Sequence, residues 1–162
     1  MLVSVDRLPR SVEEFKSMRS MDFTKPENVC MMLLCALNLY VKDPEAGVET
    51  LDLLRGPRPM NGYDVQFLRD RMRGKSYLAT AYFEGADPQN GYTPGVPYTL
   101  EVMPSPRPQD TEPGYLKVFI RTTGADFPRP VTLRQKGNDW CLWEYSSILT
   151  GIRLPEQEDP WK

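Results

Sequence analysis

Apolar residues in the first half of the chain recur at intervals of three and four, the spacing of one face of an α-helix. The clearest run follows Thr24 and Pro26 and places apolar side chains at positions 29, 32, 33, 36, 37 and 40. Thr24 and Glu27 have the spacing of a capping box, and Pro26 suits a first helical turn. Because the residues between these positions are mostly apolar as well, we expect a central helix buried on nearly all sides.

Three further helices are predicted around this one. Ser11 and Glu14 have capping-box spacing and predict a short helix. Asp43 with the proline after it indicates another helix start, and Gly56 ends that helix. Gly74 follows the last apolar stripe and terminates the fourth helix. The expected bounds are about 11–19, 43–55 and 61 or 63 to 73.

Beyond residue 75 the pattern changes to alternation, which is typical of β-strands. Five strands are predicted, at about 76–83, 96–103, 115–122, 130–136 and 139–145. Helices followed by strands indicate an α+β fold, with about four N-terminal helices packed on an antiparallel sheet of about five strands. We expect one domain over residues 1–162, in which 1–21 is a weakly patterned N-terminal segment and 155–162 is a tail.

The last two predicted strands meet at Gly137-Asn138, residue types that allow a two-residue hairpin turn. This turn sets Leu133 opposite Leu142 and places one side of the hairpin in the core. The predicted core side consists of Val131, Leu133, Trp140 and Leu142. The opposite side, called here the second face, consists of Thr132, Arg134, Cys141, Trp143 and Tyr145, extended on the preceding strand by Tyr115, Lys117, Phe119 and Arg121.

The second face mixes aromatic rings with cations and is the candidate binding surface. Its proposed contact residues are Trp143, Tyr145, Arg134, Phe119, Arg121 and Tyr115. Such a surface suits a protein partner or a small molecule, because Trp, Tyr and Arg dominate binding hot spots. Nucleic acid, which also stacks on aromatic rings, is disfavoured by a net charge of −2. Alternatively, a loop or the first helix covers this face, and Arg134 stacks on Trp143 for stability alone.

Composition removes several enzyme classes. The chain has no histidine, which excludes Ser-His-Asp and Cys-His activation and histidine zinc sites. It carries no phosphate-binding glycine motif and no EF-hand loop, so no cofactor or metal is expected and catalysis is disfavoured. Glu144 is the one acid predicted near the core side of the sheet, where burial would raise its pKa. Edge exposure or pairing with Arg153 explains Glu144 with fewer assumptions.

Three cysteines are an odd number without a CxxC pair, which favours a reducing cytoplasm over a disulfide framework or a thiolate zinc site. Arg134 shares a face with Cys141 and would lower the pKa of its thiol. The apolar run from Val29 to Val41 is shorter than the roughly 20 residues that cross a bilayer. No export signal is visible in the first residues, so we expect a cytoplasmic protein without a membrane span.

Three long phrases carry a family resemblance: FTKPENVCMMLLCALNLYVKDPEAGVETLDLLRGPRPMNGYDVQFLRDRM, YFEGADPQNGYTPGVPYTL and PVTLRQKGNDWCLWEYSSILTGIRLPEQEDPW. Over about residues 22 to 161 the chain resembles uncharacterised bacterial domains of unknown function, seen mainly in Firmicutes. This resemblance implies a bacterial protein and assigns no site residues. N-terminal helices followed by an antiparallel sheet whose last hairpin carries Gly137 and Trp140 are also similar to the cone-shaped nuclear transport factor 2-like and cystatin-like folds. This resemblance implies that the sheet is curved.

The sequence therefore favours a non-catalytic binding or protein-interaction module. The alternative is a cone-fold pocket that either binds a small molecule or acts as an enzyme through a carboxylate such as Glu144.

Overall fold

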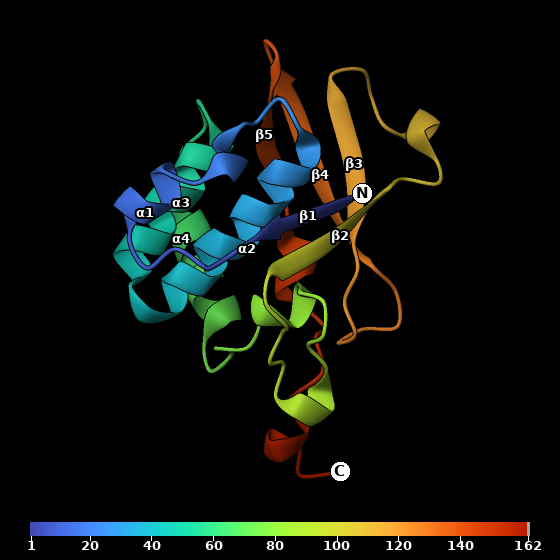
Figure 1. Cartoon of the computed structure of the whole chain (residues 1–162). Coiled ribbons are helices and arrows are strands. Elements are labelled where there is room, and N and C mark those ends of the chain that lie inside the picture. Colours follow the sequence, from blue (N-terminus) through green and yellow to red (C-terminus); the bar gives the residue numbers. More distant parts are fainter. Residues whose placement is uncertain (162) are drawn as a thin grey trace.

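The computed structural model describes residues 1–161 and contains four α-helices and five strands within them (Figure 1). The helices are α1 (Val12–Lys16), α2 (Pro26–Lys42), α3 (Pro44–Arg55) and α4 (Gly62–Met72). The strands are β1 (Leu2–Val5), β2 (Tyr98–Pro104), β3 (Tyr115–Ile120), β4 (Arg129–Lys136) and β5 (Asp139–Glu144). Short 3₁₀ helices lie between α4 and β2, at Thr80–Tyr82 and Pro88–Asn90, and after β5, at Ser146–Leu149 and Glu156–Glu158. The predicted α+β fold is confirmed.

The strands form one antiparallel sheet in the order β1-β2-β3-β4-β5. The sheet curls into a half-barrel, and the helices lie together on one side of it (Figure 1). Each strand pairs with its neighbour in sequence, as is common for antiparallel sheets.

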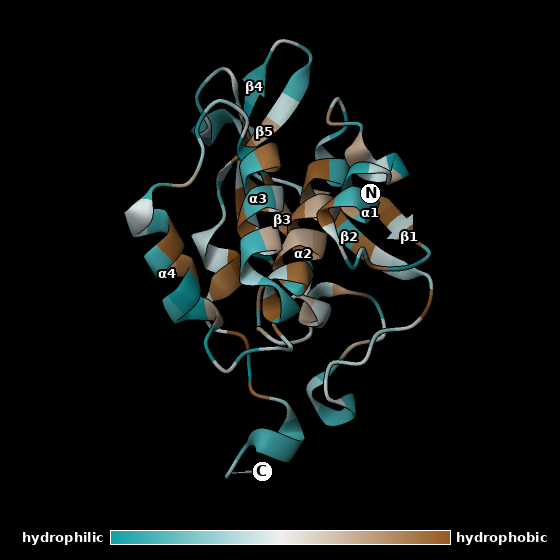
Figure 2. Ribbon diagram, turned by 90° about the vertical axis from the view of Figure 1, so that its left-hand side faces the viewer, coloured by the Kyte–Doolittle hydropathy of each residue, from teal (hydrophilic) through white to brown (hydrophobic). Residues whose placement is uncertain are grey.

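Helix α2 supplies the centre of the core, as the apolar pattern predicts. Figure 2 shows its hydrophobic residues in the middle of the molecule, and every residue from Val29 to Leu37 is fully buried. The predicted capping box does not form, because the Thr24 hydroxyl donates to the Asp22 carboxylate instead. The helix begins at Pro26, after Lys25, without a side-chain cap.

The strand predicted at 76–83 is wrong. This segment forms turns and a short 3₁₀ helix, Thr80–Tyr82, and its backbone N–H groups bond locally. Its side chains are buried on successive positions rather than alternate ones, and such apolar runs do not separate strand from other buried structure. The fifth strand is β1 instead, in the segment with the weakest pattern, where Val3 and Val5 face the core and the residues between and before them are exposed.

The β4–β5 hairpin turns at Gly137-Asn138 with Gly137 at a φ of 63°, and Leu133 lies opposite Leu142 as predicted. Beyond that pair the register shifts, because Thr132 lies opposite Glu144 and Trp143 is an extra residue on β5. A bulge of this kind disturbs the alternation of faces.

Because of the bulge, the orientations predicted for two residues are wrong. Tyr145, expected on the second face beside Trp143, is 8% exposed and belongs to the hydrophobic core. Glu144, expected near the core side, is exposed instead.

No helix within residues 1–161 has both the length and the apolar character that a bilayer span requires.

Candidate functional site

Trp143 lies half-buried on the outer face of the sheet, in contact with cations from two different elements. The guanidinium carbon of Arg58 lies 4.0 Å from the ring centroid, and that of Arg134 lies 4.7 Å away. Tyr115 on β3 packs edge-on against the same ring, 5.6 Å between centroids, and Arg134 lies 5.3 Å from the Tyr115 centroid. These four residues, Trp143, Arg58, Arg134 and Tyr115, are called the Trp143 cluster. Arg134 therefore stacks on Trp143, as expected under the alternative in which this contact serves stability alone.

Arg58 reaches the sheet because α3 ends against β5. Gly56 ends α3 with a φ of +67°, and a Cβ at this position would lie 2.8 Å from the sulfur of Cys141. A glycine therefore permits both the turn and the close approach. The Arg58 guanidinium then donates to the Trp143 carbonyl at 2.7 Å.

The outer edge of β5 is consequently occupied along part of its length. Arg58 bonds one of its carbonyls, and the Trp140 N–H donates to the Phe23 carbonyl at 2.8 Å. Natural sheets protect exposed edges in such ways against pairing with other chains. The cover over Trp143 thus comes from the α3–α4 loop, and neither the first helix nor a closed lid seals this face.

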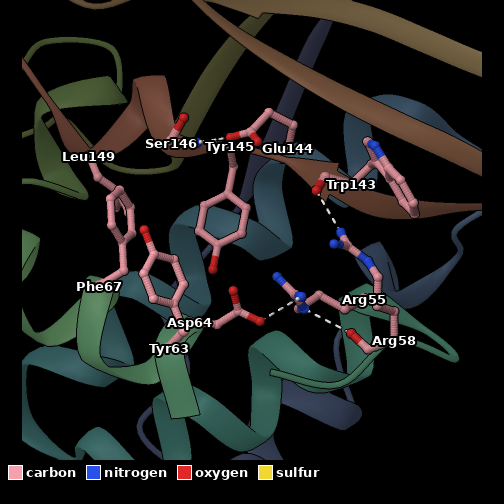
Figure 3. A pocket seen from close by; sticks show the side chains of 10 residues that line it. All are labelled: Arg55, Arg58, Tyr63, Asp64, Phe67, Trp143, Glu144, Tyr145, Ser146 and Leu149. Carbon is pink, nitrogen blue, oxygen red and sulfur yellow. Dashed lines mark hydrogen bonds and ion pairs between the residues drawn. The ribbon is translucent and has the colours of Figure 1, made fainter. Parts of the chain in front are cut away.

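Three clefts meet at Trp143. The first, called the α4 cleft, has a volume of about 300 Å³ and lies between α3, α4 and the end of β5 (Figure 3). It is lined by Arg55, Arg58, Tyr63, Asp64, Phe67, Trp143, Glu144, Tyr145, Ser146 and Leu149.

A charged pair forms the floor of the α4 cleft. Arg55 is 6% exposed, and its guanidinium lies 3.2 Å from the Asp64 carboxylate while its Nε donates to the Arg58 carbonyl. Asp64 also accepts the backbone N–H of Asn61, which completes the capping box of α4. The pair therefore ties α3, the following loop and α4 together.

The Tyr145 ring points into the α4 cleft towards Arg55 and Asp64 (Figure 3). Burial raises the pKa of the Tyr145 hydroxyl, and Arg55 offsets only part of this rise. Burial and the nearby Arg55 lower the pKa of Arg58, but an arginine starts high enough to stay charged near neutral pH. At neutral pH the cleft therefore presents a neutral phenol between charged groups, and Tyr145 does not act as a base.

The second cleft, called the hairpin cleft, has a volume of about 340 Å³ and lies between the α3–α4 loop and the β4–β5 hairpin. It is lined by Arg55, Pro57, Arg58, Arg134, Gln135, Lys136, Cys141 and Trp143. Four of these residues are cations and none is an acid. Arg55 is neutralised by Asp64, whereas Arg58, Arg134 and Lys136 form no ion pair within residues 1–161.

Cys141 lines the hairpin cleft beside these cations. The lowered pKa expected from Arg134 is wrong, because burial raises the pKa of the Cys141 thiol and Lys136 only partly opposes the rise. The other two thiols are deep in the core, where burial raises the pKa of both Cys30 and Cys35 to about 12. All three cysteines are unpaired and carry a protonated thiol near neutral pH.

The third cleft, called the loop cleft, has a volume of about 460 Å³ and is acidic. It is lined by Asp110, Thr111, Glu112, Tyr115, Lys117, Thr132, Trp143 and Glu144. Glu144 accepts the backbone N–H of Ser146 at 2.7 Å. Arg153, the pairing partner considered for Glu144, forms its ion pair with Asp126 instead.

The structure brings together half of the predicted contact residues. Trp143, Arg134 and Tyr115 form the Trp143 cluster, and Tyr145 reaches the adjoining α4 cleft from the core. Phe119 lies further along β3 and does not line any of the three clefts. Arg121 pairs with Glu101 at 3.4 Å, away from the cluster.

The residues missed by the sequence are those of the α3–α4 connection. Arg55 and Arg58 lie on either side of the Gly-Pro stop of α3, and Asp64 follows at the start of α4. The end of α3 was predicted correctly, since Gly56 ends the helix. No local pattern in the sequence indicates that Arg58 contacts a strand 85 residues later in the chain.

Within residues 1–161, no group of three or more His, Cys, Asp or Glu side chains is arranged to hold a metal ion. The acids of the α4 and loop clefts lie beside arginines, aromatic rings and backbone N–H donors.

A family model described as a domain of unknown function (DUF6935) matches residues 7–156. The chain belongs to this family. The match spans all four helices and four of the five strands, so it includes every residue of the Trp143 cluster. A search of curated proteins and a search of solved structures found no match. The resemblance to an uncharacterised domain family is thereby confirmed at the level of the family, which carries no assigned activity.

Proposed function

We propose that this domain is a non-catalytic protein-interaction module whose contact surface is the Trp143 cluster. The observation that carries the proposal is a half-buried tryptophan held by two arginines where three clefts meet. Trp, Tyr and Arg are the residues that contribute most to binding at protein interfaces. Their side chains are already ordered by mutual stacking, so a partner does not have to immobilise them.

The chemistry of the surrounding side chains supports binding over catalysis. Tyr145 is a neutral phenol with a raised pKa, and the Cys141 thiol has a raised pKa as well. Glu144, on which the alternative pocket enzyme depends, is exposed at the rim of two open clefts rather than at the base of a cavity. Helix α2 fills the concave side of the sheet, where a cone-fold ligand pocket would lie.

The same proposal places the module in the reducing cytoplasm of a bacterial cell. Three free thiols support a reducing compartment, since disulfides form and persist mainly in oxidising environments. The family resemblance supports a bacterial source.

Affinity capture from a bacterial lysate with three baits tests the proposal. Wild-type protein and Phe127→Ala should capture the same proteins, because Phe127 is an equally aromatic but remote side chain, 77% exposed. Trp143→Ala should lose one or more of them, and the purified partner should bind this variant at least tenfold more weakly, a loss of about 1.4 kcal/mol.

A second variant separates binding from folding. Arg134→Glu leaves the Trp143 ring in place and changes an exposed side chain, so its circular dichroism should match that of wild type while capture is lost. If Trp143→Ala and Arg134→Glu both retain every partner that Phe127→Ala retains, the proposed contact surface is wrong.

A further inference from the structure

Three of the cations that line the hairpin cleft form no ion pair within residues 1–161, although Asp139 lies opposite Lys136 on the hairpin. These cations are Arg58, Arg134 and Lys136, and no carboxylate is among the other side chains that line the cleft. Unpaired cations around one cleft attract an anionic group and can form strong charge-assisted hydrogen bonds with it.

Two of these cations are held in place. Arg58 is fixed by its bond to the Trp143 carbonyl and by stacking on the Trp143 ring. Arg134 stacks against both Trp143 and Tyr115. A guanidinium ordered in this way loses little side-chain entropy when it binds an anion, and its planar fork matches a carboxylate with two parallel bonds.

Part of the lining of the hairpin cleft is apolar. Pro57, Cys141 and Trp143 contribute this part, beside the four cations and the polar Gln135. A ligand that combines an acidic group with an adjacent apolar or aromatic group would therefore contact both kinds of wall.

The neighbouring loop cleft limits how far an anion extends. Trp143 is the only residue that the two clefts share, and the loop cleft carries the carboxylates of Asp110, Glu112 and Glu144. A long polyanion that crossed Trp143 would meet these carboxylates and be repelled. A short acidic stretch within an otherwise uncharged or basic chain meets no such repulsion, which favours a peptide over a nucleic acid backbone.

We infer that the hairpin cleft recognises a short acidic segment of a protein partner, with one or two Asp or Glu side chains on Arg58 and Arg134 and an aromatic side chain against Trp143. This inference rests on the proposed function, because it names the chemistry of the partner for the same surface. Lys136 adds to the attraction at the entrance without a fixed geometry.

Fluorescence anisotropy with a labelled peptide tests the inference. The probe is Gly-Glu-Glu-Phe-Gly-Lys-Lys-Gly, and its matched control replaces both glutamates by glutamine. The probe should bind with a Kd below about 1 mM, and the glutamine control should bind at least tenfold more weakly. Raising the salt concentration should weaken binding of the probe, as expected for charge-assisted contacts near the surface.

Variants locate the interaction. Arg134→Gln should weaken the probe about tenfold, and Arg134→Lys should recover only part of the loss, because lysine keeps the charge without the planar fork. Arg121→Gln is the matched control, since this exposed arginine is paired with Glu101 away from the cleft, and it should leave binding unchanged. Inorganic phosphate and a ten-nucleotide oligothymidine should compete more weakly than the unlabelled peptide.

The outcomes separate this inference from the proposed function. Equal binding of the probe and its glutamine control, no binding at about 1 mM, an unaffected Arg134→Gln variant or stronger competition by oligothymidine would each overturn the acidic-segment inference. If any of these occurs while capture of a partner still depends on Trp143, the interaction module stands with a different partner chemistry. If capture is independent of Trp143, the proposed function fails as well.

Discussion

Replacing Trp143 by alanine should lower the free energy of unfolding by about 1.5–3.5 kcal/mol. The substitution removes two cation–π contacts, from Arg58 at 4.0 Å and Arg134 at 4.7 Å, each contributing about 0.5–1 kcal/mol. It also removes the edge-on contact with Tyr115, which adds about 0.5–1.5 kcal/mol. This loss is smaller than the roughly 3–5 kcal/mol expected for a tryptophan buried in a core, because Trp143 is half-buried.

Urea unfolding followed by circular dichroism measures this loss, with an unchanged m value as the sign that the denatured state is unaltered. Trp143→Phe is the matched control, because a smaller ring retains part of each contact, and it should recover about half of the stability. A loss of at least about 4 kcal/mol would show that Trp143 is a core residue. A loss below about 0.5 kcal/mol would show that the stacked arginines contribute nothing.

A double-mutant cycle between Arg58→Ala and Trp143→Ala isolates one of these contacts. The coupling free energy should be about 0.5–1 kcal/mol, the value of a single exposed cation–π contact. The Trp143 carbonyl remains in both variants, so its hydrogen bond with Arg58 is lost equally in either background and cancels from the coupling. A coupling near zero would mean that the geometry at 4.0 Å carries no attraction.

Three further predictions concern the elements that position the cluster. Asp64→Asn leaves the buried guanidinium of Arg55 without its carboxylate partner, and the free energy of unfolding measured in urea should fall by about 2–3 kcal/mol. Asp70→Asn is the control, because Asp70 belongs to an exposed ion pair, and it should cost less than about 0.5 kcal/mol. Equal losses would contradict a structural role for the Arg55–Asp64 pair. Burial raises the pKa of Cys30 and Cys35 from 9.0 to about 12. The stability that the two protonated thiols contribute is therefore complete below pH 9 and falls between pH 9 and 12, by about 1.4 kcal/mol per pH unit for each thiol. Replacing both by alanine should flatten the fall of stability with pH in this range, and an unchanged slope would refute the raised pKa of the two thiols. Gly56→Ala places a methyl group 2.8 Å from the β5 thiol at a φ of +67° and should lower the thermal midpoint by several degrees, a cost of about 1–2 kcal/mol; an unchanged midpoint would show that the loop shifts freely.

Much of the fold follows from local patterns in the sequence. The near-continuous apolar character of α2 predicts a central buried helix, since its only low-energy location is away from water on all sides. The Gly137-Asn138 turn predicts the β4–β5 hairpin and the pairing of Leu133 with Leu142. Each of these features depends on residues close together in the chain, so periodicity and turn chemistry are sufficient to predict it.

The bulge at Trp143 shows where the local pattern fails. Strict alternation assigns Tyr145 to the outer face, but one extra residue on β5 turns Tyr145 into the core and Glu144 outwards. The same sequence is compatible with a regular strand and with a bulged one. Packing of the end of β5 against the core selects between these two arrangements. Among the predicted contact residues, Tyr145 therefore moved to the core for a reason that no local stretch of sequence contains.

Local patterns are sufficient to predict an α+β fold, a central apolar helix and the hairpin, and composition excludes histidine chemistry. Long-range packing is needed for β1 to complete the sheet and for Arg58 to reach Trp143, 85 residues away in the chain. Hydrophobic periodicity reports whether a residue is buried but not which distant segment buries it. The candidate site depends on contacts between distant segments. Arg58 and Arg134 form no ion pair within residues 1–161 and acquire a common role only when folding places both against the Trp143 ring.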